Sequence, residues 1–266
     1  MPSPPADAAF LPFTDNSMAR RVHREGILLL GGGRALLMQI AHPMVARGVA
    51  EHSHFRAGRI QRLLRTLRPT LAIVFGTREQ ALAAAAGINH IHERVTGSGY
   101  AAKDPELLLW VLATLIDTSV VMHERFVRPL KATERSAYYE DMCRVGALLE
   151  IPPGVMPGDL EALQAYVRDM TESLAVTDEA REVAEALFAS NLLTWPLLRS
   201  TRALTSGLLP EPLRAQFALP WGPKRQRALD VTARASRAVL PRLPSRLRAP
   251  PWFLLPGQGG QRMGSR

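Results

Sequence analysis

The sequence predicts an all-α protein built around one large helical domain. Signals for helix N-termini recur along the chain, and no long stretch alternates apolar with polar residues as a half-buried strand does. With 266 residues, of which 47% are hydrophobic and 21% charged, the chain can bury a sizeable core. We therefore expect about eight to eleven helices over residues 15–240, enclosing a pocket, followed by a basic tail over residues 241–266.

The N-terminal region is expected to begin with a helix pair over about residues 18–50, joined at Gly31-Gly32-Gly33. These glycines lie between two apolar stretches and no Lys-Ser/Thr follows, which indicates a hinge or a close-packing point rather than a phosphate-binding loop. His42 precedes Pro43, which favours a break there. A further helix is expected over residues 56–67, whereas LAIVF at residues 71–75 suggests a short strand.

Most of the later helices begin with a capping signal. Thr77 and Gln80 match a capping box, which predicts a helix reaching about Thr96. Asp104 followed by Pro105 is typical of the N-cap and first turn of a long helix. Further helix starts are expected at Thr133, Asp159 and Thr177.

The net charge of +9 comes from the C-terminal part of the chain. Residues 224–266 contain ten basic residues and one acid, Asp230, while the rest of the chain is neutral. A neutral body argues against a nucleic-acid-binding protein. The tail over residues 241–266 is interpreted either as a solubilising segment that returns to the fold or as a peripheral membrane contact with the apolar plug Trp252–Leu255.

Other features favour a cytoplasmic protein. A single cysteine, Cys143, excludes an intramolecular disulfide and a cysteine-cluster metal site. The longest apolar run, LLLWVLATLI at residues 107–116, is shorter than the roughly 20 residues that span a bilayer. The N-terminus shows no basic region followed by an apolar core, so no secretory signal is expected.

The histidines point to a cofactor site in the N-terminal half, because all seven lie within the first 123 residues. P-loop, G-x-G-x-x-G, H-E-x-x-H and G-x-S-x-G motifs are missing. A di-iron bundle needs two Glu-x-x-His pairs, and the sequence offers one, Glu51 with His54. A di-iron site is therefore the weaker hypothesis.

His90 and His92 lie on different faces of the helix that begins at Thr77. His92 shares a stripe with alanines and other apolar residues at three-and-four spacing, so it is expected to face inward, while His90 faces solvent. An imidazole on a shelf of small residues fits a large flat cofactor such as haem with a proximal histidine. Taken alone, the pattern fits a core histidine bonded to a backbone carbonyl better than a haem ligand.

A second cluster lies in RLLRT at residues 62–66. Arg62, Arg65 and Thr66 share one helical face. Two guanidinium groups can pair with haem propionates, and a threonine hydroxyl can hydrogen-bond to bound oxygen. The same residues can also form a basic helix face in solvent.

These motifs together resemble the catalytic domain of MpaB-type oxygenases and latex-clearing proteins (rubber oxygenases). The resemblance covers about residues 20–240 and is most specific over residues 90–130. It implies an all-helical domain that binds haem b and uses O2 to cleave or oxidise an apolar substrate, as rubber oxygenases cleave isolated carbon–carbon double bonds. The matching segments are, in order, AHPMVARGVAEHSHF, RLLRT, VFGT, HIHERVTG, GYAAKDPELLLWVLATLIDT and ERFVRPL.

The resemblance assigns His92 as the proximal iron ligand and places Arg62, Arg65 and Thr66 near the haem. The sequence departs from the family at two points. Related sequences often carry a histidine within W-x-x-A-T, where this chain has Leu112, and no glutamate lies at the matching spacing before Arg62. The nearest candidate for proton transfer is Glu51, assisted by His52 or His42, and candidate pocket walls are Leu109, Trp110 and Ala113.

The sequence therefore predicts a haem b-dependent oxygenase that acts with O2 on a small apolar substrate. By analogy with the rubber oxygenases, unsaturated compounds are candidate substrates. We expect no nucleic-acid partner. The alternative is a non-catalytic haem- or lipid-binding helical protein whose basic tail associates with a membrane.

Overall fold

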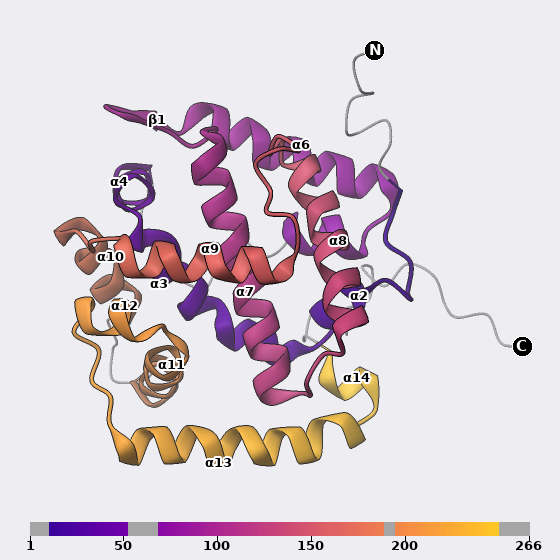
Figure 1. Ribbon diagram of the computed structural model, residues 1–266, viewed down its shortest axis with the longest axis vertical. Helices are drawn as coiled ribbons and strands as arrows, with labels where there is room; N and C mark the ends of the chain where they lie inside the picture. The colour runs from indigo at the N-terminus through magenta and orange to yellow at the C-terminus, as the bar shows by residue number, and fades with distance from the viewer. Residues whose placement is uncertain (1–10, 53–68, 189–194, 250–266) are drawn as a thin grey trace, which may run out of the picture.

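The computed structural model of the protein describes residues 11–52, 69–188 and 195–249, without side chains for residues 195–199. Helices make up about three quarters of the described chain, as expected for an all-α protein, and the one sheet in these residues is a two-stranded hairpin (Figure 1). The described residues contain more helical segments than the eight to eleven expected, because several predicted helices are divided into shorter ones.

The N-terminal region forms four segments where the sequence predicted a helix pair. They are α2 (Met18–His23), the 3-10 helix η1 (Gly26–Gly31), α3 (Gly32–Ala41) and α4 (Pro43–His52). The break between α3 and α4 falls at His42, as the following proline predicted. A Cβ atom on Gly31 would lie 2.8 Å from side-chain atoms of both Met122 and Thr118, which confirms the glycines as a close-packing point.

The strand suggested for residues 71–75 is wrong, because residues 69–75 are helical. A short, wholly apolar run fits a buried helix as well as a strand, and its periodicity does not separate the two. Arg20 donates hydrogen bonds to the carbonyls of Val74 (3.0 Å) and Phe75 (3.1 Å). It thus provides donors for carbonyl groups at the C-terminal end of the helix over residues 69–75, where the helix itself provides none. The predicted helix over residues 56–67 lies outside the described residues.

The predicted capping signals are confirmed at four helices; at one of them, α10 (Asp178–Phe188), the Ala180 amide donates to the Thr177 hydroxyl. In α6 (Arg78–Arg94) the Gln80 amide donates to the Thr77 hydroxyl and the Thr77 amide donates to the Gln80 side chain. Asp104 accepts from the Glu106 amide at the start of α7 (Pro105–Phe126), and Asp159 accepts from the Ala162 amide at the start of α9 (Leu160–Ser173). Helix α8 (Ala132–Leu148) begins slightly before the predicted Thr133.

Helix α7 runs through the middle of the bundle, with α3, α8 and α9 packed around it (Figure 1). By length and composition alone this 22-residue helix could cross a membrane, but 67% of its apolar window is buried inside the fold, as expected for a core helix. Trp110 shows how closely the core is packed. Its ring is fully buried, donates to the Gln39 carbonyl and meets Tyr166 edge-on.

The C-terminal half adds helices that close the sides and one end of the bundle. They are α10 (Asp178–Phe188), α11 (Trp195–Leu208), α12 (Glu211–Gln216), α13 (Pro223–Val239), the 3-10 helix η2 (Leu240–Arg242) and α14 (Ser245–Arg248). Helix α13 packs Leu229 and Ala233 on a small apolar cluster with Met122, Phe126 and Leu208. The boundary drawn between the domain and the tail at residues 240 and 241 stays a prediction.

An ion pair lies in the interior between α3 and α7. Arg34 and Asp117 are both buried, with Nη2 of Arg34 2.6 Å from Oδ2 of Asp117. Arg34 also donates to the Thr118 hydroxyl (2.7 Å) and to the Leu208 carbonyl (2.8 Å). One guanidinium group therefore connects α3, α7 and the end of α11.

Candidate functional site

The two histidines of α6 face opposite ways, as the helix projection predicted. Within this helix Ala81, Ala85 and Asn89 are buried, His92 is partly buried, and His90 is exposed. The alanine-rich face packs against the apolar core of the bundle. His92 is therefore the histidine of α6 that can meet a ligand within the fold.

The Nδ1 atom of His92 is buried and has no hydrogen-bond partner in the part of the chain that the structure describes. A buried, unpaired polar atom is costly and is most often explained by a missing partner. Burial lowers the pKa of His92, and the positive charge of Lys103 lowers it further. The imidazole is thus kept neutral, which is the state that binds a metal ion. The residue fits the role of an axial haem ligand, although that role itself stays a prediction.

Polar contacts fix the C-terminal half of α6. Asn89 donates a hydrogen bond of 2.9 Å to the Leu148 carbonyl at the end of α8. Lys103 forms salt bridges with Glu93 (3.1 Å), in the last turn of α6, and with Glu150 (2.6 Å), which follows α8. These contacts hold the backbone that carries His92 against the rest of the bundle.

A hairpin follows directly after His92 and packs on α4. It consists of β1 (Thr96–Gly97) paired antiparallel with β2 (Tyr100–Ala101). The Tyr100 hydroxyl donates to Oε2 of Glu51 at 2.6 Å, and His52 lies 3.2 Å from the Thr96 carbonyl. Burial and the bond to Glu51 raise the pKa of Tyr100 to about 12, so the phenol keeps its proton. The structure therefore brings Glu51, 41 positions away in the chain, to the segment that follows His92.

Glycines make this hairpin possible. A Cβ atom on Gly97 would lie 2.4 Å from the Tyr100 ring, and Gly99 has a φ of +83°, which side chains rarely adopt. Sequence analysis missed the hairpin and therefore missed Tyr100. The Gly-Ser-Gly run at residues 97–99 was the available turn signal.

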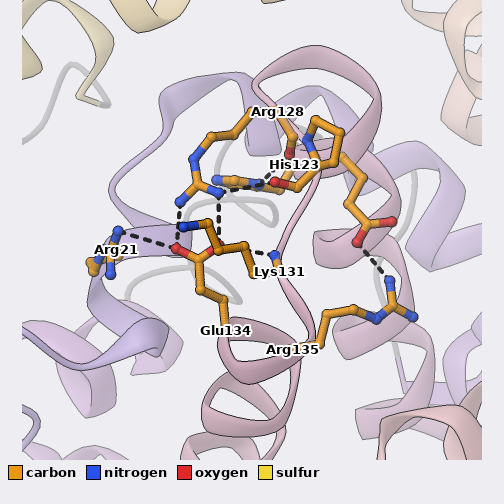
Figure 2. Close-up of polar contacts among 8 residues, drawn as sticks. Arg21, His123, Arg128, Lys131, Glu134 and Arg135 are labelled. Carbon is orange, nitrogen blue, oxygen red and sulfur yellow. Dashed lines mark hydrogen bonds and ion pairs between the residues drawn. The ribbon is translucent and has the colours of Figure 1, made fainter.

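Two other histidines have structural contacts. The Nδ1 atom of buried His123 donates to the Arg128 carbonyl at 3.1 Å. Arg128 in turn makes two 2.7 Å bonds to Glu134, which also accepts from the Lys131 amide and faces Arg21 (Figure 2). His23 lies 3.2 Å from the Tyr138 hydroxyl. Burial lowers the pKa of both imidazoles to about 4.

The lowered pKa values of His23 and His123 predict that the protein loses stability in mild acid. Each stays neutral in the folded protein down to about pH 4, whereas in the unfolded chain it takes up a proton near pH 6.5. The unfolded state therefore binds more protons as the pH falls from 6.5 to 4, and the free energy of unfolding falls through this window. The loss is on the order of 2–3 kcal/mol for each histidine by pH 4. Urea unfolding between about pH 7 and pH 4.5 measures it.

His123→Gln keeps a neutral donor for the Arg128 carbonyl but cannot titrate, so we expect a shallower pH dependence of stability. His90→Gln, on the exposed face of α6, is the matched control and should leave the slope unchanged. Glu134 contributes little above pH 4.5, because Arg128 lowers its folded-state pKa to about 2 and its ordinary pKa of 4.5 lies at the lower end of the measured window. An unchanged slope in His123→Gln would contradict the assignment.

The remaining predicted site residues are placed as follows. Arg62, Arg65, Thr66 and His54 lie outside the described residues, so their proximity to His92 stays a prediction. The Nδ1 atom of His42 accepts a hydrogen bond from the Met44 amide. Burial lowers the pKa of His42, and the negative charges of Asp104 and Glu106 at the start of α7 partly offset this effect. The predicted pocket walls Leu109, Trp110 and Ala113 are buried in the core.

Two surface hollows formed by the described residues lie elsewhere. One, of about 320 Å³, is lined by residues of α10 and α11 and by residues 217–219 after α12, and the other lies at the start of α13; His92 lines neither. Within residues 11–52, 69–188 and 195–249, no three His, Cys, Asp or Glu side chains gather as a metal site. The described residues alone therefore do not supply the other ligands of a metal at His92, whereas a porphyrin would supply four of them.

Comparison with known proteins adds to this geometry. The family model described as "ER-bound oxygenase mpaB/B'/Rubber oxygenase, catalytic domain" matches residues 19–238. Two curated relatives, the uncharacterized protein Rv2237 of Mycobacterium tuberculosis and the uncharacterized protein Mb2261 of Mycobacterium bovis, are each 31% identical over 209 residues, covering 73% of this chain and 82% of theirs. No solved structure matches significantly.

Proposed function

Because the chain belongs to the ER-bound oxygenase mpaB/B'/Rubber oxygenase catalytic-domain family, we propose that it is an oxygenase that uses haem b. It acts with O2 on a small apolar substrate, and unsaturated compounds are the first to test. The proposal includes a cytoplasmic location. The predicted membrane contact of residues 241–266 stays a prediction, since most of that segment lies outside the described residues.

The observation that carries the proposal is the unpaired, buried Nδ1 atom of His92. It belongs to the one α6 histidine that turns inward, on a helix that lies wholly within the family match. A core histidine satisfied by a backbone carbonyl, the competing interpretation, would have a hydrogen-bond partner on at least one ring nitrogen. None is found among the described residues.

In this proposal His92 binds the iron, and haem, when bound, supplies the centre at which O2 becomes reactive. Arg62 and Arg65 would hold the propionates, and Thr66 would offer a hydroxyl hydrogen bond to O2; these three roles rest on the sequence alone. The contacts of Asn89 and Lys103 keep the His92 backbone in place, so the ligand is positioned before the cofactor arrives.

Glu51 is the proposed proton-transfer group, and Tyr100 positions its carboxylate. The side chain of Glu51 is exposed, so it can exchange protons with solvent, while the bond from Tyr100 fixes one oxygen. His52 is held toward the hairpin by its contact with the Thr96 carbonyl and lies beside Glu51 in the chain. Either His52 or His42 can relay the proton onward.

Steady-state O2 consumption by the haem-loaded protein with unsaturated apolar substrates tests the function. Substrate-dependent consumption supports the oxygenase, whereas a normal haem spectrum without any consumption favours the non-catalytic haem-binding alternative. A protein that takes up no haem under conditions that load other b-type proteins would remove the cofactor assignment.

Glu51→Gln is expected to lower turnover by about 10²–10⁴-fold while the haem spectrum persists, because the amide cannot accept the proton. Tyr100→Phe should lower it less, since the carboxylate remains but loses its positioning hydrogen bond. Arg168→Gln, an exposed change on α9, serves as the control. Full activity in Glu51→Gln would exclude this residue from the proton path.

A further inference from the structure

Helix α13 lies along one edge of the molecule, at the opposite end from α6 (Figure 1). Its inner face packs Leu229 and Ala233 against α7 and α11, and Ser236 donates to the Phe126 carbonyl. The rest of the helix surface is exposed, and within the described residues no other element covers it. The helix therefore presents a long face to the exterior.

This exposed face is strongly basic. The segment from Lys224 to Arg248 contains eight basic residues and one acid. Asp230, the acid, pairs with Arg125 of α7 at 2.8 Å, so it does not neutralise the outer face. Seven of the basic side chains are exposed, namely Lys224, Arg225, Arg227, Arg234, Arg237, Arg242 and Arg246. We call the five on α13, namely Lys224, Arg225, Arg227, Arg234 and Arg237, the α13 basic face; Arg242 lies on η2 and Arg246 on α14.

Apolar side chains lie among these charges. Within the described residues six large hydrophobic side chains are highly exposed, and three of them are Val231, Val239 and Leu247. Val231 lies between Arg227 and Arg234 at helical spacings of four and three, on the same outward side. The exposed alanines 228, 235 and 238 continue this side along the helix.

The face is held in a fixed orientation. The salt bridge of Arg125 with Asp230 attaches the middle of α13. Buried Glu25 pairs with Arg248, which attaches α14 to the N-terminal region. Arg248 is thus the basic residue of the segment that turns inward, while the others face outward. A rigid basic face needs no folding step before it meets a flat, anionic partner.

We propose that the α13 basic face binds the surface of an anionic lipid bilayer, with α13 lying parallel to the membrane plane. Arginine and lysine attract anionic headgroups, and apolar residues between them enter the headgroup region. A nucleic-acid site would use the charges but gives no reason for Val231 and Val239 of α13 to be exposed among them. The proposal is independent of the haem site, because α6 lies at the other end of the molecule.

Co-sedimentation of the full-length protein with vesicles tests the proposal. We expect binding to phosphatidylcholine vesicles containing about 30% phosphatidylserine at ~0.15 M salt, and none to phosphatidylcholine alone. The double variant Arg227→Glu/Arg234→Glu should weaken binding at least about a hundredfold, since each basic residue near the surface contributes several-fold. Val231→Ser should weaken it by a smaller factor.

The double variant Arg94→Glu/Arg168→Glu is the matched control, because it changes the net charge equally at exposed positions on α6 and α9. It should retain binding, and unchanged far-ultraviolet circular dichroism verifies folding of each variant. Equal losses in both double variants would show a non-specific charge effect and overturn the proposal. Binding to duplex DNA in place of vesicles would overturn it as well.

Discussion

Replacing His92 with alanine is expected to abolish the Soret band of protein that has been loaded with haem, or to shift it to that of weakly held haem. The change removes the imidazole whose buried Nδ1 atom has no partner among the described residues. Because the described residues around it provide no cluster of three metal-binding side chains, loss of this one ligand should release the iron from protein coordination. Absorption spectra at equal protein concentration measure the effect.

His90→Ala is the natural control for this experiment. His90 lies two positions away on the same helix, but it is exposed and contacts Glu93 at 3.6 Å on the solvent side. Its replacement should leave the spectrum unchanged. Added imidazole should restore a coordinated spectrum in His92→Ala, which would separate loss of a ligand from loss of the fold. An unaltered Soret band in His92→Ala would eliminate this histidine as the ligand.

The largest effect on stability is expected at Arg34. Arg34→Met removes the charged partner of Asp117 while the carboxylate stays buried between α3 and α7, with the Gln164 amide, 3.4 Å away, still donating to it. An uncompensated buried charge costs about 3–5 kcal/mol of folding free energy, a large part of the stability of an average domain. Urea unfolding monitored by circular dichroism provides the measurement.

Two further variants test whether this loss of stability comes from the unpaired buried charge. Arg24→Met breaks an exposed pair with Asp15, 3.5 Å long, and should cost at most about 1 kcal/mol. Arg34→Met/Asp117→Leu removes both charges and should recover much of the stability, because an apolar pair needs no compensation. If Arg34→Met alone unfolded no more readily than Arg24→Met, the buried pair would have no role in holding α3, α7 and α11 together.

Local signals in the sequence predicted the features that depend on neighbouring residues. The capping box at Thr77 and the cap at Asp104 are satisfied within one turn of helix, so a few residues were enough to find them. The inward position of His92 also followed from periodicity, because three-and-four spacing fixes which side chains share a face. The apolar run at residues 71–75 failed as a strand because its pattern fits a helix equally well.

By itself, then, the sequence determined the helical class, the family and the orientation of His92, because each depends on neighbouring residues or on the order of motifs along the chain. Only the tertiary structure decided that Arg34 pairs with Asp117, that Tyr100 holds Glu51, and that the C-terminal charge forms a face on α13. The partners in each pair are dozens of positions apart in the chain. Periodicity fixes which way a side chain points from its helix, but only the packing between helices decides which residues that side chain contacts.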